Sequence, residues 1–138
     1  MSYKFLDHST DAIIEINAKD LKEAFSTAAD AVINLTLDQD KVEEIETKEF
    51  VSQGKDLYYL LFSWLEEIPF ILITEGFAIK RLEFDIEKNE TYKIQAKAFG
   101  ENLDLKKHNF KVEIKAPTFY EMIIKNEDTV YMKFLLDL

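Results

Sequence analysis

Hydrophobic residues recur along the chain with two different spacings, and each change of spacing marks a predicted element. Residues 12–17 place Ala12, Ile14 and Ile16 on one face of a predicted strand, and Ile13 on the other face indicates that both faces are partly covered. From Leu21 to Leu35 the apolar residues fall three and four positions apart, which predicts an amphipathic helix with Asp20 as its N-cap. The same spacing predicts a second helix from Lys55 to Ile68, which Pro69 should end or kink.

The other segments have patterns typical of strands. Residues 42–51 are polar and fit an edge strand. In residues 77–86 the apolar positions are odd before Lys80 and even after Arg81, which predicts a bulge between the two halves. Further strands are predicted at residues 91–99, 112–116, 119–124 and 130–136. The order of elements predicts an α+β fold in which two main helices pack on a mostly antiparallel β-sheet.

Composition narrows the class of protein. The 138 residues are 47% hydrophobic and 13% aromatic, which excludes intrinsic disorder, and no linker-like tract divides residues 1–138, so we expect a single domain. The absence of cysteine excludes a disulfide scaffold, a thiol nucleophile and cysteine-bound metal. The most apolar stretch, residues 57–73, is interrupted by Glu66, Glu67 and Pro69, so we expect a cytoplasmic protein with no membrane span.

The charge balance limits the partners. The formal net charge is −10, from 27 acidic and 17 basic residues, and Arg81 is the sole arginine. Nucleic acids are bound through clustered lysine and arginine, so direct tight binding to RNA or DNA is disfavoured. A basic protein or a metal cation remains compatible with this charge.

Catalytic motifs are missing, but both ends of the chain carry oxygen ligands. The chain has no GxSxG, P-loop, GxGxxG or HExxH sequence, so we assign no catalytic residue. A polar pentapeptide that ends at Asp11 directly precedes the first predicted strand, and Asp137 follows the last one on its outward phase. A structural turn and a frayed terminus would explain the two features separately. Together they would make an oxygen-rich site for a hard divalent cation.

At these residues the sequence resembles the archease family. The resemblance rests on several short pieces in a common order and covers nearly the whole chain: His8-Ser9-Thr10-Asp11, Leu21-Lys22-Glu23-Ala24-Phe25, Asp56-Leu57, Trp64-Leu65, Ala98-Phe99-Gly100-Glu101, Leu103-Asp104, His108, Glu113-Ile114-Lys115-Ala116 and Asp137-Leu138. No single piece is specific, but the ordered set is.

The resemblance implies a function and a site. Archeases are similar small α+β proteins that activate the RtcB-type RNA ligase of tRNA splicing by promoting its guanylylated, multiple-turnover state. The family's divalent-cation site maps onto Asp11, Asp137 and a main-chain oxygen of Leu138, and we expect Ca²⁺ as the ion. The resemblance also implies an activating or partner-contacting role for Lys115 and His8.

The sequence departs from the family pattern in two places. Ser9-Thr10 stands where the family has Thr-Ala, which keeps the turn and changes the placement of its hydroxyl. A histidine that often follows the lysine is absent after Lys115, so no role can be carried over for it. Three other functions stay open: a chaperone-like protein-binding module, a calcium-binding protein without a ligase role, and a stand-alone hydrolase.

Overall fold

The computed structural model describes residues 2–6 and 11–138, so the predicted site residue His8 lies outside the described residues. The elements follow the chain in this order: β1 (Ser2–Leu6), β2 (Asp11–Ala18), α1 (Leu21–Thr36), η1 (Gln39–Lys41), β3 (Glu46–Gly54), α2 (Leu57–Pro69), η2 (Phe70–Thr74), β4 (Phe77–Lys88), β5 (Tyr92–Asn102), β6 (Ala116–Asn126) and β7 (Val130–Asp137). The elements η1 and η2 are a 3₁₀ turn and a π-helical turn.

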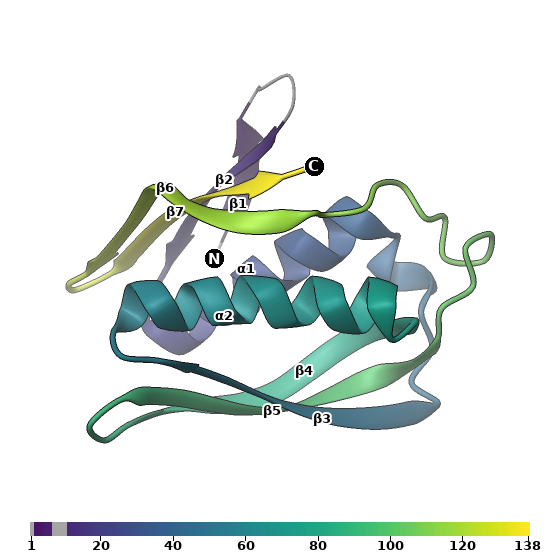
Figure 1. Ribbon diagram of the computed structural model, residues 1–138, viewed down its shortest axis with the longest axis horizontal. Helices are drawn as coiled ribbons and strands as arrows, with labels where there is room; N and C mark the ends of the chain where they lie inside the picture. The colour runs from purple at the N-terminus through teal and green to yellow at the C-terminus, as the bar shows by residue number, and fades with distance from the viewer. Residues whose placement is uncertain (1, 7–10) are drawn as a thin grey trace.

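The strands form two antiparallel sheets with the helices between them. One sheet has the strand order β1-β2-β7-β6 and the other β3-β5-β4. In Figure 1 the two helices form the middle layer, with the four-stranded sheet on one side and the three-stranded sheet on the other. The predicted α+β fold, with two helices packed on antiparallel strands, is confirmed. The strands divide into two sheets, however, where the sequence predicted one.

Trp64 of α2 joins the helical layer to the three-stranded sheet. Its indole N–H donates a 2.9 Å hydrogen bond to the carbonyl oxygen of Phe25 on α1. Its ring packs against Phe50 of β3 and Phe84 of β4, with centroids 5.6 and 4.9 Å apart. On the other side, fully buried Ile14 and Phe134 present the four-stranded sheet to the same core cluster. Trp64 therefore contacts both α1 and the three-stranded sheet.

Both helices begin at an aspartate cap, of which the sequence predicted Asp20 alone. Asp20 accepts a 2.9 Å hydrogen bond from the backbone N–H of Glu23 at the start of α1, and Asp56 caps α2 in the same way. Pro69 is the last residue of α2, and the chain continues through η2 instead of stopping. This continuous segment, residues 57–74, is the one stretch of the described chain long and apolar enough to span a membrane by length and composition alone. It packs as a core helix between the two sheets.

The strand predictions were partly right. The bulge in β4 is confirmed, because the pairing with β5 shifts register between Ile79 and Arg81. The predicted strand at 112–116 is wrong: β6 begins at Ala116 and includes the region predicted as a separate strand at 119–124. Pro117 is tolerated inside it because β6 is an edge strand, where a missing N–H breaks no ladder. The first strand, β1, was not predicted.

Candidate functional site

Asp11 and Asp137 lie directly opposite each other in the pairing of β2 with β7. The carbonyl oxygen of Asp137 accepts a hydrogen bond from Lys115, on the β6 side of β7. The N–H and C=O of one strand residue point to the same neighbour, so Asp137 forms a non-hydrogen-bonded pair with Asp11. In such pairs the Cα atoms are about 4.5 Å apart, and both side chains lie on one face of the sheet. Both aspartate side chains therefore lie on the outer face of the sheet.

Lys115 reaches the same place from a third segment. Its backbone N–H lies 2.8 Å from the carbonyl oxygen of Asp137, and the next residue, Ala116, pairs with Asp137 in the sheet. The Lys115 side chain is exposed. Ile114 is buried while Ala116 is exposed, so the period of two on which the predicted strand at residues 112–116 rested breaks here.

Leu138 follows Asp137 directly and packs half-buried against the core. Four of the five predicted site residues are thus neighbours: Asp11, Asp137 and Leu138, with Lys115 beside them. The donor set offers two carboxylates and a main-chain oxygen, which is the chemistry of a hard cation such as Ca²⁺. In the described part of the chain no group of three or more His, Cys, Asp or Glu side chains is placed to hold a metal. Water or a partner would have to supply the remaining ligands.

A hydrogen-bonded network anchors the loop that leads to Lys115. His108 is fully buried, and its Nδ1 accepts a 3.0 Å hydrogen bond from the backbone N–H of Asp104. Its proton therefore sits on Nε2, which donates to the Glu101 carboxylate at 3.0 Å. This bond, with further donors from the Glu43 backbone and Lys107, lowers the pKa of Glu101 to about 2. Of these residues, Glu101, Asp104 and His108 belong to the pieces that resemble the archease family, and in this structure they anchor the loop.

A second anchor fastens the same loop to the end of α1. Asp38 accepts from the side chains of Lys111 at 2.9 Å and Asn109 at 3.0 Å, which lowers the pKa of Asp38 to about 2. The backbone N–H of Asp38 donates to the carbonyl oxygen of His108 at 2.9 Å. Residues 104–111 are therefore tied both to β5 and to α1. Sequence analysis missed this network, although the spacing of Asp104 and His108 was a local signal for a capped turn.

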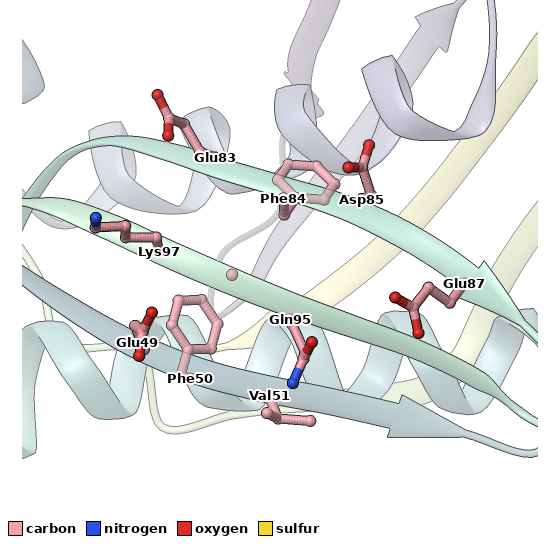
Figure 2. Close-up of a pocket in the computed structure, with 10 residues that line it drawn as sticks. Glu49, Phe50, Val51, Glu83, Phe84, Asp85, Glu87, Gln95 and Lys97 are labelled. Atoms are coloured by element: carbon pink, nitrogen blue, oxygen red, sulfur yellow. The ribbon is translucent and has the colours of Figure 1, made fainter.

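The three-stranded sheet carries a second charged surface. Figure 2 shows acidic side chains of β3 and β4 around Lys97 and Gln95 of the central strand β5, over a depression of about 540 Å³. Several of these carboxylates already have partners within the chain: Glu83 binds Arg81 at 2.6 Å and Asp85 binds Lys22 at 2.9 Å. This face is an ion-paired sheet surface, and the pair of aspartates on the other sheet is the better candidate for a cation site.

Comparisons with known proteins give a consistent family. A sequence model of the archease protein family (MTH1598/TM1083) matches residues 3–138. The protein archease of Pyrobaculum islandicum is 38% identical over 134 residues, 96% of this chain and 91% of that protein. The protein archease of Pyrococcus abyssi is 39% identical over 124 residues, 89% of this chain and 87% of that protein. The solution structure of Methanobacterium thermoautotrophicum protein 1598 has a TM-score of 0.78 and 28% identity, covering 99% of this chain and 98% of that one.

Proposed function

The chain belongs to the archease family, whose members are known as activators of tRNA-splicing ligases, and from this premise we propose that it activates an RtcB-type RNA ligase during tRNA splicing. It acts in the cytoplasm as an accessory protein, promotes guanylylation and multiple turnover of the ligase, and performs no ligation itself. The net charge of −10 supports this division of work. An acidic accessory protein is attracted to a basic RNA-handling enzyme without competing for its RNA.

The observation that carries the proposal is the pairing of Asp11 with Asp137. Two carboxylates that lie opposite each other on one face of a sheet can both bind a cation placed between them. We assign the cation as Ca²⁺, held by Asp11, Asp137 and a main-chain oxygen of Leu138, because oxygen-only ligand sets suit hard divalent ions. When bound, such an ion supplies positive charge and open coordination positions.

The residues around the site determine the direction in which the open coordination positions of the ion point. Asp137 is exposed and Asp11 partly exposed, so the ligand face opens to the outside of the four-stranded sheet. Lys115 holds an ammonium group on the neighbouring segment, and its backbone is fixed to Asp137 by one hydrogen bond. Together these groups present positive charge on an otherwise acidic protein, at a place suited to phosphate or carboxylate oxygens of the ligase and its nucleotide.

Turnover by the partner ligase tests this function. The RtcB-type ligase of the same organism would be assayed with excess RNA ends, GTP and metal, with and without this protein. We expect the protein to raise the number of ligations per ligase molecule above one and to increase the guanylylated fraction. A ligase whose turnover and guanylylation are unchanged by the protein would reject the proposal and leave a calcium-binding or chaperone-like role.

A further inference from the structure

One side of helix α2 carries apolar side chains that the fold leaves partly exposed. Tyr59, Phe62, Glu66, Phe70 and Ile73 follow each other at spacings of three and four residues along α2 and η2, and we call them the α2 outer stripe. Tyr59 is 44% exposed and Phe70 is 49% exposed. In Figure 1 this helix runs along the open side of the molecule, between the edge strands β6 and β3. Helix faces that meet only solvent are normally polar.

Edge strand β6 extends this apolar surface. Its pairing with β7 is irregular between Thr118 and Ile123, and Glu121 has a positive φ of 57° within that bulge. The bulge brings the Phe119 ring onto α2, 4.3 Å from Phe62 and nearly parallel to it at 11°. Phe119 is nevertheless 43% exposed. An ordered aromatic surface that stays open to solvent is a common feature of protein–protein interfaces.

The other end of the stripe opens into a groove of about 550 Å³, between η2 and residues 113–117. Its lining includes the apolar residues Phe70, Ile73 and Ile114, together with three acidic residues and one lysine: Glu66, Glu67, Glu113 and Lys115. None of these charged side chains makes an ion pair within the described residues.

The three acids outnumber the lysine, so the groove has an excess of negative charge. Partial burial together with the charges of Glu66 and Glu75 raises the pKa of Glu67. The carboxylates of the groove therefore outnumber its one ammonium group and lie beside apolar side chains. A cationic side chain on an apolar segment would complement both properties of the groove.

We propose that the α2 outer stripe and its groove form the docking surface for the partner ligase, and that the occupant is a segment of the ligase carrying lysine or arginine between apolar side chains. This inference rests on the proposed function. Lys115 lines the groove, and its N–H is bound to Asp137. A segment seated there would place the ligase beside the Asp11–Asp137 pair. The excess of carboxylates argues against RNA as the occupant.

Two substitutions with a matched control test the surface. Glu66→Lys reverses one charge at the groove, and Phe70→Ala removes an exposed aromatic ring from the residues that line it. Glu90→Lys changes the net charge by the same amount in the β4–β5 turn, at the far end of the twelve-residue strand that begins beside η2. The complete proteins would be titrated with the RtcB-type ligase of the same organism to measure Kd, with ligase turnover and circular dichroism measured on the same samples.

We expect Glu66→Lys and Phe70→Ala each to weaken ligase binding about tenfold or more, with the folded state intact, while the Kd of Glu90→Lys stays within about twofold of wild type.

An equal loss of ligase affinity in Glu66→Lys and Glu90→Lys would overturn the docking surface, because the loss would then come from long-range charge alone. Unchanged Kd in both groove variants, with wild type still activating the ligase, would overturn the docking surface and keep the proposed function. Wild type that neither binds nor activates the ligase would reject both. Selective loss of self-association in the groove variants, with ligase binding unchanged, would identify a second copy as the occupant and overturn the inference.

Discussion

The backbone N–H of Lys115 donates a 2.8 Å hydrogen bond to the carbonyl oxygen of Asp137. This bond links the residue before β6 to the end of β7, at the open end of the β6–β7 hairpin. It also fixes the orientation of Asp137 toward Asp11, because it commits the backbone of Asp137 to the β6 side. The backbone of Lys115 is therefore fixed relative to the aspartate pair. The side chains of the lysine and of the two aspartates can still be substituted one at a time.

Calcium should stabilise the wild-type protein and not the Asp11→Ala variant. Asp11 lies on the outer face of β2, so its removal makes no core cavity. A ligand at about 100 times its Kd stabilises the folded state by about 2.7 kcal/mol, which raises the melting temperature by several degrees for a domain of this size. Thermal melts with Ca²⁺ and with a chelator check this. A calcium-dependent shift that is equal in both proteins would place the ion elsewhere.

Lys115→Ala should lower activation of the ligase severalfold without changing stability. The side chain is exposed, and its backbone hydrogen bond to Asp137 survives the substitution. Lys106→Ala is the matched control, since Lys106 is also exposed and lies in the same loop. Ligase turnover and denaturant unfolding would be measured for both. If Lys115→Ala activates the ligase as fully as wild type, Lys115 has no role in activation and serves only as a solubilising surface residue.

Stability should fall in acid partly through Glu101. Its pKa is about 2 in the folded protein, against 4.5 for an ordinary glutamate, chiefly because His108 donates to the carboxylate. A lowered folded-state pKa stabilises the protein above about pH 4.5, and this contribution is lost as the pH falls from about 4.5 to about 2. Glu101→Gln should flatten the loss of unfolding free energy over that range, and Glu90→Gln should leave it unchanged. Parallel pH profiles for wild type and Glu101→Gln would contradict this account.

Gly100→Ala should destabilise the three-stranded sheet. A Cβ at position 100 would lie 1.8 Å from the carbonyl oxygen of Ala78, next to the bulge in β4. Neither backbone can move without breaking the ladder, so we expect a cost of about 1–3 kcal/mol. Denaturant unfolding followed by the fluorescence of Trp64, the sole tryptophan, measures this directly. Gln95→Ala on the outer face of β5 is the control and should change little.

The sequence predicted those elements whose periodicity is local. Both helices, the cap at Asp20 and the bulge at Lys80 follow from side-chain spacing, and the structure has them. The split into two sheets was not predictable in this way, because strand partners are set by contacts between distant segments. The prediction of a strand around Ile114 was wrong because a loop with one buried residue can show the same alternation of apolar and polar residues over a few positions.

Much of the candidate site followed from the resemblance. The residues alone suggested that the two chain ends could meet, but the register of Asp11 with Asp137 is a property of the assembled sheet. The open side of α2 could not be told from the buried side, because helical spacing alone does not show which apolar face is covered. The exposed positions of that helix carry a second group of apolar residues, which also follow each other at spacings of three and four.

Ligase turnover with Asp11→Ala and Asp137→Asn tests the central claim most directly. Both variants should fold and fail to gain stability from calcium. The account predicts that neither raises ligase turnover above the level of the ligase alone, whereas wild type does. Variants that are folded, insensitive to calcium and still as active as wild type would contradict the claim that the aspartate pair carries the function.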